Sequence, residues 1–74
     1  MSLKNDYRIT FQRPGQAERS EVHRRRLTPP EASQAFRDTR LTERMAEKSY
    51  NFPTAWKLER FYGLQGWHTI LEVD

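Results

Sequence analysis

The side chains best suited to chemistry in this chain are the arginines of its N-terminal third. Residues 1–26 carry seven lysines and arginines against three acids, and Arg24, Arg25 and Arg26 are consecutive. The planar guanidinium group forms paired hydrogen bonds with phosphates and carboxylates. This composition favours a polyanion or an acidic protein surface as the partner.

The arginines predict a nucleic-acid contact on an N-terminal hairpin. A two-stranded ribbon fits the major groove of duplex DNA, and phosphate neutralisation supplies affinity that does not depend on base sequence. Three consecutive strand residues cannot all point the same way, so a solvated edge strand is the alternative interpretation. The predicted contact residues here are Arg8, Arg13, Arg19, Arg24, Arg25 and Arg26.

Catalytic chemistry has little support in the sequence. The chain has no cysteine, no Gly-x-Ser-x-Gly elbow and no phosphate-binding loop, and its two histidines are His23 and His68. Glu59 or Glu72 could assist His68 as a general base, but no second histidine is near to complete a metal site. We expect both histidines at a solvated surface and predict a non-enzymatic protein with no catalytic residue, metal or cofactor.

Four aromatic residues of the C-terminal third could stack on single-stranded bases or build the core. They are Trp56, Phe61, Tyr62 and Trp67. A stacking platform needs them on an exposed sheet face. A chain of this size has few other large apolar residues, so we expect at least three of the four to be buried. Phe61 opposes Trp56 and Tyr62 in strand parity and is the candidate for an exposed partner contact.

Length and composition predict one small domain, residues 1–74, with 1–6 as a flexible tail. The chain has 74 residues, of which 35% are hydrophobic and 31% charged, so its core must be lean. The absence of cysteine suits a reducing cytoplasm. No apolar run reaches the roughly 18 residues of a membrane span, and no signal-peptide segment is present, so a cytoplasmic protein without a membrane partner is expected.

Alternating residues predict an N-terminal hairpin. Residues 7–13 place Tyr7, Ile9 and Phe11 on one face of a strand. After a turn at Pro14-Gly15, residues 20–27 return as a strand that is polar on both faces, which is typical of a sheet edge.

A second hairpin is predicted near the C-terminus. Residues 55–62 and 67–73 alternate, and a turn bounded by Gly63 and Gly66 joins them. The spacing predicts that four residues share one face of the last strand: Trp67, Thr69, Leu71 and Val73. Six of the nine aromatic residues lie between 50 and 67, so we expect the core to centre there.

The segment between the hairpins predicts a helix that starts at Pro29. Thr28 and Glu31 have the spacing of a capping box, and Pro29 suits the first helical position. Leu41 falls on the side opposite the first apolar stripe, so the helix either has two apolar sides or breaks near Asp38. The predicted fold is α+β: an N-terminal β-hairpin, one or two central helices and a C-terminal β-hairpin, ββαββ, with the sheet packed on helix.

The stretch Leu27-Thr28-Pro29-Pro30-Glu31-Ala32 resembles the start of the helix-turn-helix in small excisionase-like winged-helix DNA-binding proteins, which often read Leu-Thr-x-x-Glu-Ala. The resemblance implies a second, recognition helix over residues 40–47 and a wing over 56–73. A recognition helix of that family enters the major groove, and here it would contact DNA through Arg40, Arg44 and Lys48.

The sequence thus predicts a small basic binding module. The first hypothesis is binding of nucleic acid, chiefly DNA, or nucleoprotein assembly of the kind common on phages and other mobile elements. The alternative is a protein-interaction module, an adaptor or an inhibitor, that docks a partner or a second copy of itself through an edge strand or the aromatic hairpin.

Overall fold

Within residues 3–46 and 52–74, which the computed structural model describes, the chain forms one antiparallel sheet and one long helix. The strands are β1 (Asn5–Gln12), β2 (Ser20–Leu27), β3 (Thr54–Phe61) and β4 (Trp67–Val73). The helix α1 (Pro29–Ala46) joins β2 to β3, and a 3-10 turn, η1 (Gly63–Gln65), joins β3 to β4. The strand order is β2-β1-β3-β4. The predicted α+β class with ββαββ order is confirmed.

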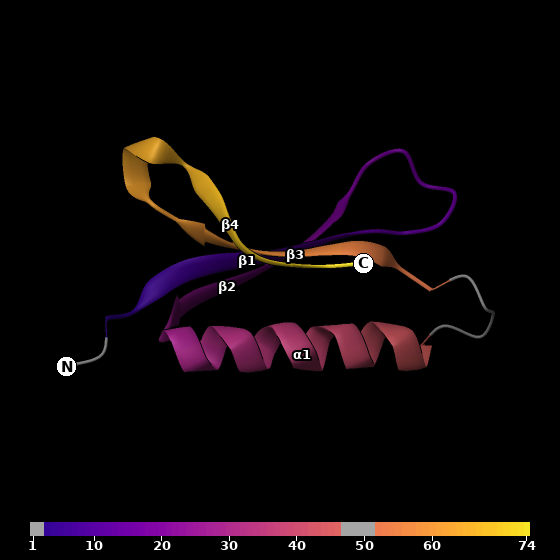
Figure 1. Ribbon diagram of the computed structural model, residues 1–74, viewed down its shortest axis with the longest axis horizontal. Coiled ribbons are helices and arrows are strands. Elements are labelled where there is room, and N and C mark those ends of the chain that lie inside the picture. Colours follow the sequence, from indigo (N-terminus) through magenta and orange to yellow (C-terminus); the bar gives the residue numbers. More distant parts are fainter. Residues whose placement is uncertain (1–2, 47–51) are drawn as a thin grey trace.

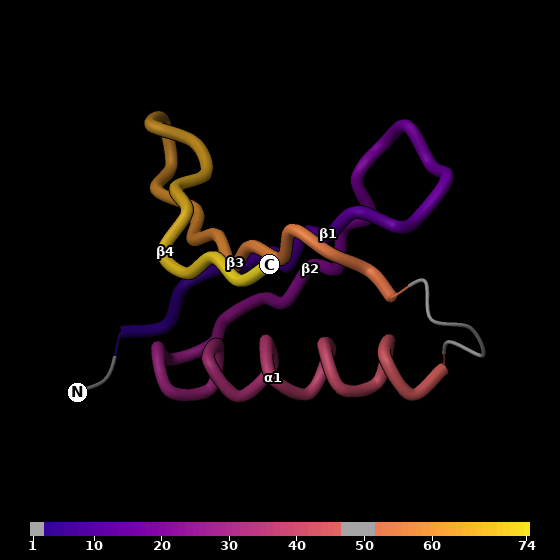
Figure 2. Tube along the Cα trace, turned by 45° about the vertical axis from the view of Figure 1, so that its right-hand side comes forward, coloured from indigo at the N-terminus to yellow at the C-terminus, as the bar shows by residue number. Residues whose placement is uncertain are grey.

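The helix lies against one face of the sheet, and the tips of both hairpins bend away from it at opposite ends of the molecule (Figures 1 and 2). Because α1 connects strands that flank β1, it packs against β1, β2 and β3. We call the opposite side of the sheet the open face. The prediction that residues 20–27 form an edge strand is confirmed, since β2 is outermost.

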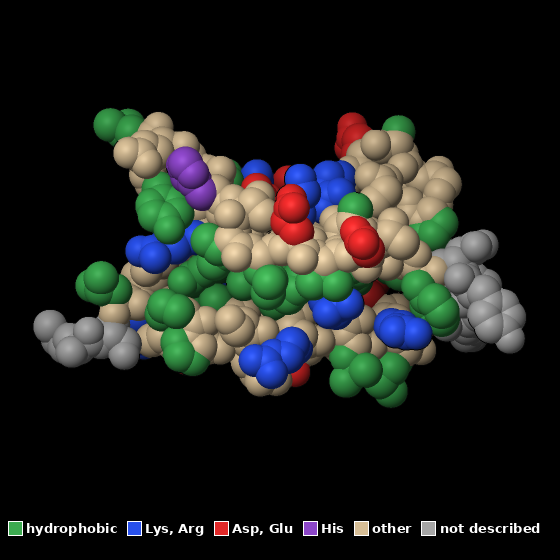
Figure 3. Space-filling model, viewed as in Figure 1, with side chains coloured by type: hydrophobic (Ala, Val, Ile, Leu, Met, Phe, Trp, Pro, Cys, Tyr) green, Lys and Arg blue, Asp and Glu red, His purple; other side chains and the backbone are tan. Residues whose placement is uncertain are grey.

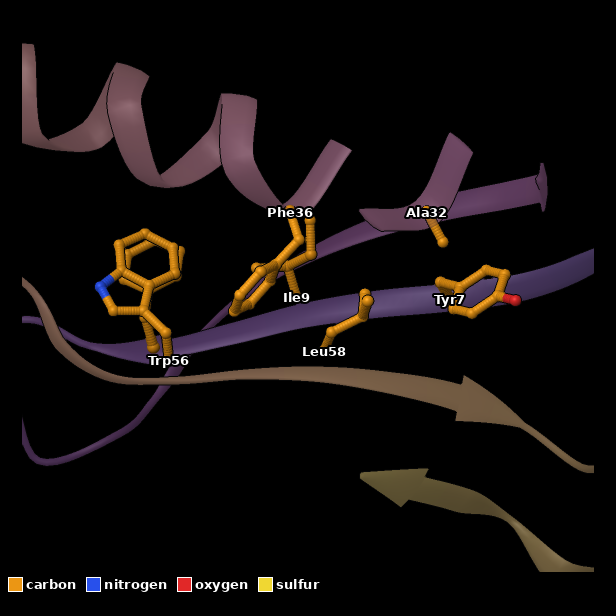
Figure 4. Close-up of a cluster of buried hydrophobic side chains, with 7 residues drawn as sticks. Tyr7, Ile9, Ala32, Phe36, Trp56 and Leu58 are labelled. Carbon is orange, nitrogen blue, oxygen red and sulfur yellow. The ribbon is translucent and has the colours of Figure 1, made fainter. Parts of the chain in front are cut away.

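The core fills the space between α1 and the helix-facing side of β1 and β3 (Figure 4). The Trp56 ring stacks on Phe11 with centroids 4.3 Å apart, and its centroid is 6.4 Å from that of Phe36 in an edge-to-face contact. Its Nε1 donates to the Pro53 carbonyl oxygen at 3.1 Å, which satisfies the one polar atom of the indole. The buried hydrophobic residues are Tyr7, Ile9, Phe11, Ala32, Phe36, Trp56 and Leu58.

The buried residues are spread more evenly along the chain than the positions of the aromatic residues predicted. β1 supplies three of the buried hydrophobic residues and β3 supplies two. Of the four aromatic residues considered for the core, Trp56 is buried, Phe61 and Tyr62 are each 41% exposed, and Trp67 is half-buried. The prediction that at least three of them are buried is wrong, because the far end of the β3–β4 hairpin bends away from α1 (Figure 1).

The start of α1 is the predicted capping box. The Thr28 amide and hydroxyl each donate to Glu31 Oε1 at 2.9 Å, and the Glu31 amide donates back to the Thr28 hydroxyl at 3.4 Å. The bond from the Thr28 backbone, and then that from its hydroxyl, lower the pKa of the Glu31 carboxyl. None of the described helices is both long and apolar enough to cross a membrane.

The helix does not break near Asp38. It is continuous from Pro29 to Ala46, and Asp38 accepts a hydrogen bond from Gln34 Nε2 at 2.8 Å instead of capping a new helix. A helix-turn-helix needs two helices, so the predicted recognition helix over 40–47 is corrected to the second half of α1, as far as the structure describes it. Leu41 and Met45 stay exposed.

A β-bulge changes which residues of β4 share a face. Leu58 opposes Leu71, whereas Glu59 opposes Thr69, so Ile70 is an extra residue in β4. Leu71 therefore faces the helix side, while Thr69 lies on the open face with Glu59. The prediction that Trp67, Thr69, Leu71 and Val73 share one face is wrong, because strict alternation cannot show an inserted residue.

A second bulge ends β2. Asn5 opposes Leu27 while Tyr7 opposes Arg24, and Arg26 adopts a left-handed conformation with φ 59°. The extra residue turns Leu27 back to the helix side, where it packs against the core. The Arg26 amide donates to Asp6 Oδ1 at 3.1 Å, and β1 begins at Asn5, so Asn5 and Asp6 belong to the sheet although they fall within the expected tail, residues 1–6.

Candidate interaction surface

The two outer strands of the sheet carry different side chains. β2 has five exposed charged or imidazole residues: Glu21, His23, Arg24, Arg25 and Arg26. At the centre of β4 lie Ile70 and Leu71, which are 48% and 42% exposed. Charged side chains normally protect an edge strand from pairing with other chains. β4 is therefore the edge with the character of a contact surface.

Arg8, a predicted nucleic-acid contact, lies within an ion-pair network on the open face. Its Nε is 2.8 Å from Glu59 Oε1, and its Nη1 is 3.7 Å from Glu21 Oε1. The guanidinium also lies 4.6 Å from the centroid of the Trp67 ring. Arg8 therefore joins β1, β2 and β3 and has little capacity left for a ligand.

Arg13 and Arg19 hold the β1–β2 connection in place. Arg13 Nη2 is 2.8 Å from Glu43 Oε2, which ties the connection to α1. The Arg19 guanidinium donates to Thr10 Oγ1 at 2.9 Å and also to the Ala55 carbonyl oxygen of β3. Both predicted contacts thus have structural partners.

The three consecutive arginines of β2 point in different directions. Arg24 opposes Tyr7 and so shares the helix-facing side, whereas Arg25 lines a shallow hollow on the other side together with Phe61. Arg26 is at the bulge. The structure therefore does not bring the six predicted hairpin arginines onto one surface.

A different set of arginines does come together, on α1. Arg40 and Arg44 were predicted contacts, and the structure adds Arg37 on the same side of the helix. Lys48, the third residue predicted there, lies outside the described residues. The spacing of Arg37, Arg40 and Arg44 by three and four positions was visible in the sequence and would have revealed this helix face.

These arginines border a groove between α1 and the sheet, at the end where β3 begins and Asp74 follows β4; we call it the β4 groove. Figure 3 shows hydrophobic side chains in a band between the helix and the sheet, with lysine and arginine side chains along the helix. The groove has a volume of about 400 Å³. Its lining residues are Arg37, Arg40, Leu41, Arg44, Phe52, Pro53, Thr54, Trp56 and Asp74.

The far end of the β3–β4 hairpin adds exposed aromatic surface. Phe61, the predicted partner contact, is exposed and packs against Trp67 with ring centroids 5.1 Å apart. The Tyr62 ring meets His68 at 4.9 Å, and Leu64 at the tip is fully exposed. Exposed apolar side chains of this size gather at interaction sites.

Both histidines are exposed, as predicted. His23 Nε2 is 3.2 Å from Glu21 Oε2 on β2, and His68 lies on β4. Among residues 3–46 and 52–74, no group of three or more histidine or acidic side chains is placed to hold a metal ion.

No protein-family model, curated protein or solved structure matches this chain. The surface chemistry is therefore the basis for a functional proposal. Its distinctive features are the exposed apolar residues of the edge strand β4 and the cationic groove that Asp74 lines directly after that strand. Such an edge can pair with an extended polypeptide through backbone hydrogen bonds, while the groove contacts alternate side chains.

Proposed function

We propose that this protein is a small non-enzymatic module that binds a protein partner through the outer edge of β4. The observation that carries the proposal is the exposure of Ile70 and Leu71 at the centre of that strand. β4 pairs with β3 on one side and with no described strand on the other. A partner strand laid along β4 would bury both side chains and satisfy the unpaired backbone groups.

The aromatic end of the hairpin supports the same proposal. Phe61, Tyr62 and Leu64 extend the exposed apolar surface beyond the strand. A single exposed apolar residue is ordinary on a protein surface, whereas several on one hairpin are typical of a contact site.

Binding of nucleic acid is the second candidate, carried by the β2 arginines. Arg24, Arg25 and Arg26 are exposed and form no ion pair with any described residue. Their side chains do not share one face, which favours the protein partner as the first candidate.

The proposed function can be tested by selecting random peptides displayed on phage against the immobilised protein. The enriched peptides are then titrated against the wild type and against an Ile70→Lys, Leu71→Lys variant. We expect the variant to bind about tenfold more weakly or worse, because lysines on an edge oppose strand addition. A Gln16→Lys, Ala17→Lys variant adds the same charge on the exposed β1–β2 connection and should bind like the wild type.

Failure to enrich any peptide, or equal binding by the wild type and the edge variant, would overturn the proposal. A short DNA duplex provides the competing result. If the duplex binds at about 50 mM salt with steep salt dependence, and the Arg24→Ala, Arg25→Ala, Arg26→Ala variant loses that binding, the second candidate replaces the first.

A further inference from the structure

We infer that the partner segment is acidic and extended, and that it lies along β4 with its carboxylates over the β4 groove. This inference rests on the proposed function and adds the chemistry of the partner. It joins two features: the unpaired edge of β4, and the arginine-bearing groove that Asp74 lines directly after that strand ends.

The cations of the β4 groove have no acidic partner among the described residues. No ion pair within residues 3–46 and 52–74 involves Arg37, Arg40 or Arg44. The Arg40 Nε is buried and makes no hydrogen bond to any described group. A buried donor without an acceptor costs free energy that a ligand carboxylate can recover.

The acids of α1 are engaged elsewhere. Glu31 accepts the capping bonds, Asp38 accepts from Gln34, and Glu43 pairs with Arg13. Asp74 lines the groove but forms no ion pair with these arginines. The lining thus holds three arginines and one acid, a local excess of two positive charges.

The apolar floor of the groove selects an alternating segment over a uniformly charged one. Trp56 and Phe52 line the groove, and the Arg44 guanidinium lies 5.0 Å from the centroid of the Phe52 ring. Successive residues of a strand point to opposite faces. A segment beside β4 can therefore direct every second side chain toward the helix side, where the arginines lie, and place its apolar side chains on the open face.

A second copy of this chain is a poorer occupant. α1 packs beneath β1, which lies two strands inside β4. With strands about 4.8 Å apart, symmetric pairing of two β4 edges would leave the two helices roughly 24 Å apart, whereas packed helices are about 8–10 Å apart. The pairing would leave both grooves unfilled.

A nucleic acid also fits less well. Its charge repeats at every unit and on every side, whereas these arginines border one side of the groove. The opposite side of β4 presents Glu72, whose carboxylate is 3.7 Å from Lys57 Nζ. An alternating segment matches this division of charge, and a phosphate backbone does not.

The inference can be tested with three end-capped peptides that alternate valine with glutamate, serine or lysine. Each is titrated into isotope-labelled protein and followed by amide shifts in NMR spectra. We expect the glutamate peptide to bind most tightly, to shift amides of residues 37–44 and 70–74 together, and to weaken about tenfold on Arg37→Gln, Arg44→Gln substitution. That variant keeps the half-buried Arg40 in place and so protects the fold.

The matched control is Arg24→Gln, Arg25→Gln, which removes the same charge from β2 and should leave binding of the glutamate peptide unchanged. Equal binding of the glutamate and serine peptides, both lost on Ile70→Lys, Leu71→Lys substitution, would overturn the acidic partner and leave the proposed function standing. Glutamate-peptide binding that is unaffected by the groove substitutions would overturn the site. DNA that shifts the same amides and requires Arg37 and Arg44 would also overturn it.

Discussion

β2 and β4 occupy equivalent places at the two borders of one sheet, yet they meet solvent differently. β2 turns Val22 and Leu27 inward against the core and displays charged residues outward. β4 turns Val73 inward and leaves Ile70 and Leu71 exposed at its centre. Charged side chains therefore protect the β2 edge against pairing with other chains, and the centre of the β4 edge lacks that protection.

The difference follows from where the second layer of the fold ends. α1 packs against β1, β2 and β3, so β4 extends past the helix that covers its neighbours. An apolar residue on β2 has a helix beneath it, whereas Leu71 on the same side of the sheet is 42% exposed. One helix beneath four strands thus covers the β2 edge of the sheet and leaves the β4 edge uncovered.

The largest loss of stability is expected for Trp56, a core residue on β3, the strand next to β4. Trp56→Ala should destabilise the fold by about 3–5 kcal/mol, because it removes the contacts with Phe11 and Phe36. Urea unfolding followed by far-ultraviolet circular dichroism measures the change. Trp67→Ala, on the half-buried indole of the open face, should cost less than about 2 kcal/mol. Equal losses of stability for the two variants would contradict the assignment of Trp56 to the core.

Making the β4 edge charged and the β2 edge apolar should reverse the effect of each edge on aggregation. Ile70→Lys, Leu71→Lys should raise the concentration at which the protein aggregates severalfold, and Arg24→Ile, Arg25→Ile should lower it, since charge on an edge opposes association. Static light scattering over a concentration series gives both values. If neither exchange alters aggregation, the contrast between the edges has no consequence for association.

Replacing an arginine should cost more stability on β1 than on β2. Arg8→Met breaks the partly buried pair with Glu59 and should cost about 1–2 kcal/mol, whereas Arg24→Met should stay within about 0.5 kcal/mol. Chemical denaturation of the two single variants distinguishes them. A larger loss for Arg24 would mean that the β2 arginines are structural and would remove the basis for the nucleic-acid candidate.

The smallest effect on stability is expected at the capping box of α1, which directly follows β2. The pKa of Glu31 is lowered in the folded state, so its ionised form stabilises the fold above the ordinary glutamate pKa of about 4.3, and this contribution is lost as the pH falls through the lowered value. The wild type should therefore exceed Glu31→Gln in stability at neutral pH and lose that advantage in acid. Urea midpoints at several pH values test this, with Glu18→Gln in the β1–β2 connection as the control. An advantage that does not change with pH would contradict the role of the carboxylate.

Local signals were sufficient to predict the elements. The capping box placed the helix start at Pro29. The turn at Pro14-Gly15 with the return of the chain over 20–27 placed β2, and the alternation over 67–73 placed β4, at their observed bounds. These signals depend on residues within one turn or one strand, and the sequence displays them directly.

The faces and the surface could not be predicted in the same way. The inserted residue Ile70 reverses the orientation of half of β4, and a bulge leaves no mark in an alternating pattern. Whether Arg8 is available to a ligand depends on Glu59 and Glu21, which approach it only across the assembled sheet. The β4 groove escaped prediction because its other wall comes from the start of β3 and from Asp74, not from α1.

The central position of β1 has a consequence during synthesis. β1 and β2 can pair once both have emerged, but an isolated hairpin is only marginally stable. The other side of β1 must wait for β3, and the bonded pair Arg8 and Glu59 are 51 residues apart. Pairing over such a separation is slow, and an unpaired central strand is prone to misassociation on a nascent chain. We expect the charged residues of β2 to oppose such misassociation until the C-terminal hairpin has been made.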